Sequence, residues 1–406
     1  MQPAGPRSFG KECPMRYDKN WENLYFPDFS PFARLDPERG IMLMSADMFA
    51  PDGSFPQEVK DAIHRAVDND QLHYPTGEVQ ADFEAAVAQK LADFNHIALD
   101  ENTRMLTVPG SAFGLFLSIR VLVDPNQDSE VINFTPTFAE NMNDVIMMGA
   151  RNVFCPLSAE NGYQIDVEQL ERCVTPNTRC IVLTHPANPI GTVYPRKTLE
   201  KLAEMLRRRD LFAVVDQVFE RSVYDGREYT TFASLPGMAE RTLTVFGPSK
   251  ELRLSGLRIG YVVGPAELIE KMRVAANNYV GLPNPLSMAA CAEAYRHLEY
   301  TEEWRRILER RRNTAQKILD AIPNVSCPLP PAGFSFWLDV SRLGGSDEIV
   351  AYLVEHAQVG VGPGHWFGIN CDGYLRVMFA CYKDDETIYE ACRRIAAALR
   401  QYQGLD

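Results

Sequence analysis

The chain has 406 residues, of which 46% are hydrophobic and 23% are charged, and its formal net charge is −13. This length suits two globular domains, and the acidic balance argues against binding to nucleic acid or to an anionic membrane. The sequence contains no run of about 18 apolar residues, so it predicts no membrane span. The first residues lack the apolar core of a signal peptide. The nine cysteines contain no CxxC pair and no cluster at metal-ligand spacing. They predict reduced thiols in a cytoplasmic protein that binds no metal.

The first 50 residues are rich in proline and in aromatic residues, which include Trp21, Tyr25, Phe26, Phe29 and Phe32. We interpret this segment as an extended arm that packs on another surface, such as that of a second subunit. A poorly ordered tail is the alternative interpretation.

Short apolar segments rich in Val, Ile and Phe recur between helical patterns. Continuous hydrophobicity is typical of strands that are buried on both faces. The predicted strands are 105–108, 131–134, 152–155, 181–184, 212–216, 242–246 and 259–263. Helices such as 112–123 and 196–209 would connect them, so the pattern predicts an α/β fold. Its large domain would hold a mainly parallel seven-stranded sheet sandwiched by helices.

The pattern changes after about residue 296. A long amphipathic helix at 301–322 precedes strand-like segments near 334–340 and 374–380 and a final helix at 386–402, which predicts a smaller α+β domain. We place an N-terminal arm and part of the small domain at 1–55, the large domain at 56–295 and the C-terminal small domain at 296–406. The glycine-rich segment 360–364 contains a proline and lacks a following helical pattern, so we interpret it as a turn.

Ligands of open α/β sheets bind outside the carboxyl ends of the strands, so polar residues at those ends can form one site. Gly110, Ser111 and Ala112 enter a helix after one predicted strand, where free backbone N–H groups can bind a phosphate. Phe138 follows another strand and either stacks on a planar ring or belongs to the core. Asn188 lies in a turn between prolines, where it can hydrogen-bond a phenolic oxygen.

Charged residues complete this constellation. Asp216 ends a buried apolar strand, where a carboxylate needs a cationic partner such as a protonated pyridine nitrogen. Lys250 follows another strand, where desolvation can make its amine nucleophilic. Arg258 can hold a phosphate as a planar fork of donors, and Arg376, among apolar residues, needs an anion such as a substrate carboxylate. The set suggests a lysine in Schiff-base linkage to a phosphorylated aldehyde, pyridoxal 5′-phosphate.

The order of these motifs resembles that of the class I and II aminotransferases, which are fold-type I pyridoxal phosphate enzymes. The motifs are GSA at 110–112, PTF at 136–138, HPANPIGT at 185–192, VVD at 214–216, SK at 249–250, RIGY at 258–261 and YLRVMF at 374–379. The resemblance spans the chain from about Ile41 to its end. It implies a homodimeric enzyme that moves an amino group from an amino acid to a 2-oxo acid.

Roles for individual residues follow from the same resemblance. Lys250 resembles the Schiff-base lysine that also moves the substrate proton, Asp216 the partner of the pyridinium nitrogen, and Arg376 the clamp for the substrate carboxylate. Asn188 resembles the donor to the phenolic oxygen O3′ of the cofactor, and it also belongs to the expected substrate site. The other expected cofactor contacts are Gly110, Ser111, Ala112, Phe138, Phe219, Ser249, Arg258 and, from the neighbouring subunit, Tyr74.

Three features depart from the family pattern, and one of them is that the small N-terminal glycine that meets the substrate carboxylate is not obvious in residues 44–47. Phe219 stands where the family usually has a tyrosine that donates to O3′, and Gly247 replaces a serine of the phosphate site. Some relatives with phenylalanine at the first position are not transaminases, so a pyridoxal phosphate lyase, decarboxylase or cyclase is the alternative function. An effector-binding domain of a transcription regulator is a third interpretation. It is disfavoured because the first 50 residues lack the helical pattern of a DNA-binding module.

Overall fold

The computed structural model describes residues 18–25, 27–44, 56–75 and 77–405, and seven strands form one large sheet in it. The strand order is β2-β8-β7-β6-β5-β3-β4, in which β8 is antiparallel to both neighbours and the other neighbouring pairs are parallel. The strands are β2 (Thr103–Val108), β3 (Glu130–Thr135), β4 (Arg151–Pro156), β5 (Thr178–Thr184), β6 (Phe212–Asp216), β7 (Thr242–Phe246) and β8 (Gly260–Pro265). The predicted seven-stranded, mainly parallel sheet is therefore confirmed.

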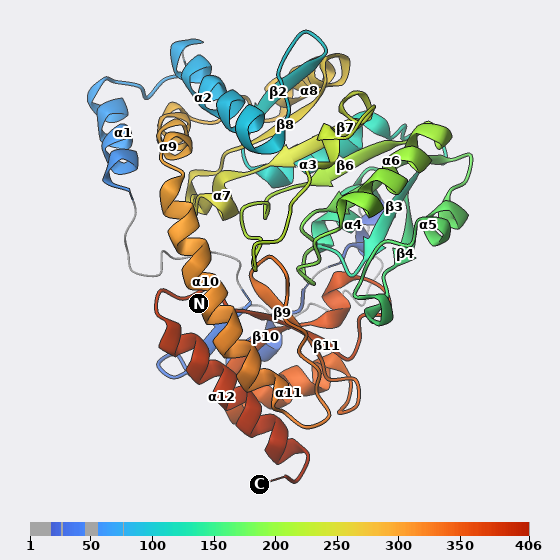
Figure 1. The fold of residues 1–406 in the computed structure, drawn as a ribbon, viewed down its shortest axis with the longest axis vertical. Coiled ribbons are helices and arrows are strands. Elements are labelled where there is room, and N and C mark those ends of the chain that lie inside the picture. The colour runs from blue at the N-terminus through green and yellow to red at the C-terminus, as the bar shows by residue number, and fades with distance from the viewer. Residues whose placement is uncertain (1–17, 26, 45–55, 76, 406) are drawn as a thin grey trace.

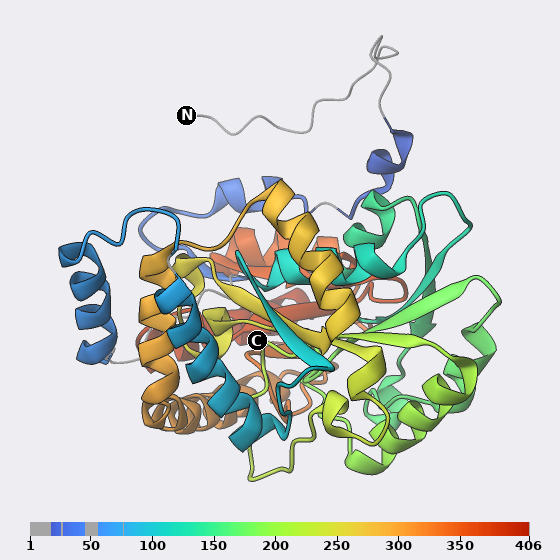
Figure 2. The same cartoon turned by 90° about the horizontal axis from the view of Figure 1, so that it is seen from above.

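Helices cover both faces of this sheet (Figure 2). Cys180 and Val182 of β5 pack toward α3, α4 and α8, whereas Ile181 and Leu183 pack toward α5 and α6. Near β8 the second face is covered by α2 and α9. The helices are α2 (Gly77–Lys90), α3 (Ser111–Leu122), α4 (Ala139–Met147), α5 (Val167–Cys173), α6 (Arg196–Arg209), α8 (Ala266–Tyr279) and α9 (Pro285–Arg296). Burial on both faces explains why the strands are continuously apolar.

A smaller domain contains the second sheet, of order β1-β10-β11-β9 (Figure 1). Its strands are β1 (Ile41–Leu43), β9 (Ser335–Asp339), β10 (Val359–Pro363) and β11 (Tyr374–Met378). Its helices are α10 (Glu299–Asp320), α11 (Ser346–Ala357) and α12 (Asp385–Tyr402), and α10 leads into this domain from the large one. The predicted small α+β domain is confirmed, while the proposed domain limits of 1–55, 56–295 and 296–406 stay a prediction.

The interpretation of 360–364 as a turn was wrong, because most of the segment belongs to strand β10. β10 pairs in parallel with β1 and antiparallel with β11. A Cβ atom at Gly360 would lie 2.6 Å from the Met42 sulfur and 3.0 Å from the Phe32 ring. The glycine therefore marks a close approach between strand and arm rather than a turn.

The described part of the arm packs on its own chain. The backbone N–H of Tyr25 donates to Asn143 Oδ1 at 2.7 Å, and Asn143 Nδ2 donates to the Tyr25 carbonyl at 3.0 Å. The Phe29 ring lies 5.6 Å from that of Trp366, centroid to centroid. Residues 1–17, Phe26 and 45–55 lie outside the described residues, so the expected contact with a second subunit stays a prediction.

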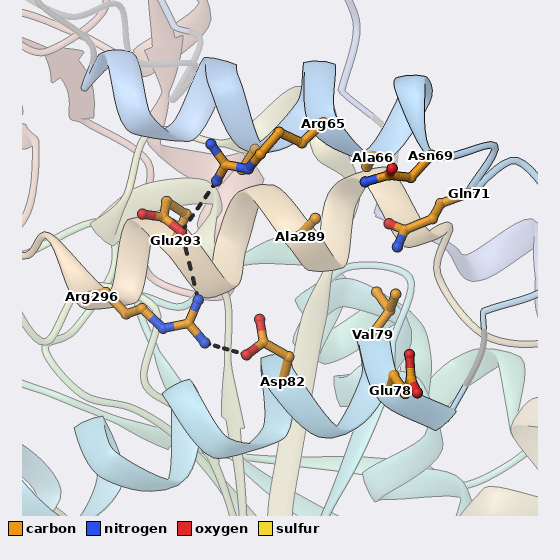
Figure 3. A pocket seen from close by; sticks show the side chains of 11 residues that line it. Arg65, Ala66, Asn69, Gln71, Glu78, Val79, Asp82, Ala289, Glu293 and Arg296 are labelled. Carbon is orange, nitrogen blue, oxygen red and sulfur yellow. Dashed lines mark hydrogen bonds and ion pairs between the residues drawn. The ribbon is translucent and has the colours of Figure 1, made fainter.

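Helix α1 (Gln57–Asp68) packs on α9, and a polar groove lies between α1, α2 and α9 (Figure 3). Arg65 and Arg296 both form ion pairs with Glu293, and Arg296 also pairs with Asp82. These paired charges line part of the groove, and no residue of the predicted site lines it. None of the helices in the described part of the chain has the length and apolarity needed to cross a membrane.

Candidate active site

The carboxyl ends of the central strands bring the predicted residues to one edge of the large sheet. Asp216 is the last residue of β6, and it pairs with Thr184 of β5 on one side and with Val245 of β7 on the other. Asn188 follows β5 and Lys250 follows β7 after a few residues. Parallel pairing therefore places these three side chains around the same point.

Asp216 and Lys250 form the electrostatic centre of this edge. Asp216 is buried, and burial raises its pKa to about 7, although the Val218 N–H at 3.4 Å and the charge of Lys250 act in the opposite direction. Lys250 is half-buried on the one-turn helix α7 (Pro248–Glu251). Within the described residues no cation forms an ion pair with Asp216, so this carboxylate can accept a cationic partner.

A helix N-terminus beside an arginine forms the second part of the site. Gly110 precedes α3 as its N-cap residue with φ +91°, and as a glycine it has no side chain that could cap this helix. A Cβ atom at Gly110 would lie 2.9 Å from Arg258 Nη2, and one at Gly247 would lie 3.1 Å from Ser111 Cβ. Ser249 is buried in the adjoining turn. Uncapped N–H groups, hydroxyls and a guanidinium together suit a phosphate.

Arg376, Asn188 and Phe219 line one small cavity. Arg376 is buried on β11, and this burial lowers its pKa to about 10. Its Nη2 donates to the Met44 carbonyl at 2.9 Å, while its Nε is buried without a hydrogen-bond partner in the described structure. Phe219 packs edge-on against Phe334, with 5.1 Å between ring centroids. The arginine therefore keeps an unused donor for an anion.

A second, larger space adjoins Arg376, with a volume of about 520 Å³. We call it the arm cleft, because the arm forms one wall and the start of α4 another. Its lining includes Tyr25, Phe29, Phe138, Glu140, Trp366 and Arg376. Of these, only Phe138 and Arg376 were expected at the site. Glu140 was missed although it lies two residues after Phe138, because a glutamate in the first turn of a helix is ordinary.

Two expectations are not tested by the geometry of one chain. Tyr74 lies in the loop between α1 and α2, its side chain is 92% exposed, and it lines neither the small cavity nor the arm cleft. Ala112 follows Ser111 in the first turn of α3. The described residues contain no group of three or more histidine, cysteine or acidic side chains arranged to hold a metal.

A buried ionic cluster lies directly behind the site. The Lys90 ammonium contacts the Glu220 carboxylate and lies 3.8 Å from Glu251 Oε2, and all three side chains are buried. Glu220 follows Phe219 in the chain and Glu251 follows Lys250. Removing one partner from such a cluster leaves an uncompensated buried charge, so the cluster fixes the backbone on both sides of the site.

Fold and site together define a pyridoxal phosphate enzyme of fold type I, and comparison with known proteins identifies the family. Residues 40–395 match the family described as aminotransferase class I and II, and the chain belongs to it. Members of this family depend on pyridoxal phosphate and transfer amino groups between amino acids and 2-oxo acids. The chain is therefore a pyridoxal phosphate-dependent aminotransferase.

Individual relatives agree with this assignment. Aromatic-amino-acid aminotransferase 2 of Thermococcus litoralis is 31% identical over 88% of this chain and 92% of its own. Aspartate aminotransferase of Pyrococcus abyssi is 30% identical over the same shares. The crystal structure of aspartate aminotransferase from Rhizobium meliloti superposes with a TM-score of 0.86 at 28% identity, covering 95% of this chain and 99% of that one.

Proposed function

We propose that Lys250 binds the cofactor covalently and moves the substrate proton during transfer of the amino group to a 2-oxo acid. The observation that carries this proposal is the position of Lys250 beside the buried carboxylate of Asp216, at the ends of two paired strands. When bound, pyridoxal phosphate supplies an electron sink for the negative charge that develops at the substrate Cα. Once the substrate amine has displaced Lys250 from the cofactor, its free Nζ would take the proton from the substrate Cα and deliver it to C4′ of the cofactor.

The described residues fit this cofactor. Asp216, which forms no ion pair with any described residue, would hold the pyridinium nitrogen. Phe138 would lie on the ring face, and Asn188 would donate to the phenolic oxygen. The phosphate would lie at the uncapped start of α3, against Arg258. Ser111, Ala112 and Ser249 would contribute the remaining donors.

Arg376 would orient the substrate through its carboxylate. Nη2 donates to the Met44 carbonyl, and Nε has no partner in the described structure, so Nε is a donor available to the substrate. A guanidinium held in this way fixes the carboxylate in one plane and aligns Cα with Lys250. The relatives named above act on aspartate or on aromatic amino acids, so their names do not decide which amino acid this chain uses.

The experiment that tests this function combines labelling with a reaction assay. The purified protein is reduced with borohydride, and its peptides are mapped. We expect the cofactor on Lys250 and none on Lys90, which is buried in an ionic cluster. Amino donors are then incubated with a 2-oxo acid. Equal formation of a new amino acid and a new 2-oxo acid supports the proposal, whereas ammonia or carbon dioxide released without consumption of the 2-oxo acid contradicts it and favours a lyase or decarboxylase.

We also propose that the active unit is a homodimer in which Tyr74 reaches the phosphate site of the partner. The exposure of this tyrosine supports the proposal. Tyr74→Ala and Lys250→Ala variants, each inactive alone, should regain activity when their subunits are exchanged, because one site of the hybrid is then intact. No recovery of activity in a mixture shown to contain hybrid dimers would contradict the shared site.

We further propose a reducing, cytoplasmic setting, because the eight cysteines of the described residues are free thiols.

A further inference from the structure

The arm cleft is a preformed space rather than a gap between loose segments. Two hydrogen bonds join Tyr25 of the arm to Asn143 of α4. The Phe29 ring packs on Trp366 at 5.6 Å, and the Trp366 ring packs in turn on buried Phe32 at 6.3 Å. Both walls are therefore held in position by contacts within this chain.

The lining of the cleft is largely apolar and aromatic, and it includes Arg376. Tyr25, Phe29, Met44 and Trp366 provide flat or flexible apolar surface. Such surface suits the methylene groups of a long side chain, and aromatic faces also attract a cation. Among the described residues that line the cleft, Arg376 is the one cationic side chain.

Glu140 is the acidic side chain in this lining. Burial raises its pKa, while the charges of Arg376 and Lys250 act in the opposite direction and favour its ionised form. In the part of the chain that the structure describes, no cation forms an ion pair with it. Asp144, one turn further along α4, does not line the cleft, and burial raises its pKa to about 8. Glu140 is thus the carboxylate that an incoming side chain meets.

Substrate binding affects the charges of Arg376 and Glu140 differently. The substrate carboxylate neutralises Arg376, and this removes one cation that stabilises Glu140. Glu140 then takes up a proton unless a new cationic partner arrives, and a guanidinium or ammonium group of the substrate supplies that partner. A side chain that ends in a second carboxylate would be repelled, because the lining has no further described cation to receive it.

We infer that the arm cleft receives the side chain of the amino-acid substrate, and that Glu140 selects side chains with an aliphatic stem and a guanidinium or ammonium end. The inference rests on the proposed function, in which Arg376 binds the substrate carboxylate. Dicarboxylic amino acids are poor substrates on this view, and neutral aromatic ones are intermediate, because they fill the apolar space without engaging Glu140.

The test uses substrate analogues that lack the α-amino group and therefore cannot react. 5-Guanidinopentanoate, 3-phenylpropanoate and glutarate each keep the carboxylate for Arg376 and differ in the other end. Their binding to the cofactor-loaded enzyme is measured by calorimetry. We expect the guanidino compound to bind at least about tenfold more tightly than glutarate and more tightly than 3-phenylpropanoate. Equal or tighter binding of either competitor would overturn the inference.

Two variants on α4 test whether Glu140 causes the preference for the guanidino compound. Glu140→Gln should weaken the guanidino compound about tenfold and leave 3-phenylpropanoate within about threefold. The matched control is Asp144→Asn on the same helix, which should leave all three affinities within about threefold. An unchanged guanidino affinity in Glu140→Gln would refute the role of Glu140. Arg376→Lys separates the two proposals, since it should weaken all three analogues alike. If it weakens none of them, the carboxylate clamp of the proposed function has failed instead.

Discussion

Gly110 lies against the guanidinium of Arg258, so closely that a Cβ atom at position 110 would stand 2.9 Å from Nη2. The same glycine has φ +91°, a backbone conformation that residues with a side chain rarely adopt. Gly110 therefore serves two ends: it permits the turn from β2 into α3, and it leaves room for the arginine beside the helix N-terminus.

We expect Gly110→Ala to weaken pyridoxal phosphate binding by at least about tenfold, because the new methyl group displaces the phosphate-binding arginine. Pyridoxal without its phosphate should be affected much less. The control is Gly149→Ala, which has φ +72° and open space around its Cβ position, so it introduces backbone strain alone. Dissociation constants from absorbance titrations measure both variants. Equal losses in the two would show that strain, and not Arg258, is responsible.

Asp216 should make the stability of the cofactor-free protein depend on pH. Its pKa lies near 7 in the fold, chiefly through burial, against 3.8 as its ordinary value. The folded state therefore holds this proton more tightly than the unfolded chain, and the stability that Asp216 contributes falls as pH rises from about 4 to about 7. We expect Asp216→Asn to stabilise the cofactor-free protein by roughly 2–4 kcal/mol at pH 8 and by little at pH 4.

Denaturant unfolding at both pH values measures this difference. Exposed Asp128 supplies the control, since Asp128→Asn should change stability little at either pH.

In the cofactor-loaded enzyme we expect Asp216→Asn to be harmful, because the carboxylate then pairs with the pyridinium nitrogen. There, Asp216→Asn should lower turnover by orders of magnitude. A variant that keeps the wild-type rate within about threefold would remove Asp216 from the cofactor site.

Arg376→Lys should raise the KM for the amino donor about 10- to 100-fold while the visible absorbance of the bound cofactor persists. An ammonium group cannot donate to the Met44 carbonyl and hold a carboxylate in one plane as the guanidinium does. Arg311, which is also buried but is bonded to Asp385 and to backbone carbonyls, is the control. Arg311→Lys should lower the melting temperature and leave KM unchanged. The reverse pattern would exchange the roles of the two arginines.

The sequence predicted the large sheet because its strands are buried on both faces, which makes their apolar character local and continuous. It failed for β10, where Gly360 and Gly362 are typical of a turn. The extended form of this segment arises from its pairing with β1, more than 300 residues earlier in the chain. The local sequence pattern of a segment does not show that it pairs with a strand so far away in the chain.

Some residues of the candidate site could likewise be proposed from the sequence, whereas others depend on the folded structure. Asp216 and Arg376 could be proposed from the sequence, since a charge inside an apolar segment is conspicuous. Lys250 could be proposed because it follows a buried strand in a motif that resembles that of the family. Glu140 could not, because its importance depends on the folding of the arm and of β11 around the start of α4. The role of Tyr74 depends on a second subunit, so neither the sequence nor the fold of one chain settles it.

Phe219 offers a direct test of the ring position. Its side chain packs on Phe334 and shares a cavity with Asn188 and Arg376. A hydroxyl added there would donate to the phenolic oxygen of the bound cofactor and stabilise its negatively charged form. We therefore expect Phe219→Tyr to move the pH titration of the visible absorbance to lower pH. Phe113→Tyr, on α3, should leave the titration in place. A titration that does not move in Phe219→Tyr would place this residue away from the phenolic oxygen, and the departure from the family pattern would then carry no consequence for the reaction.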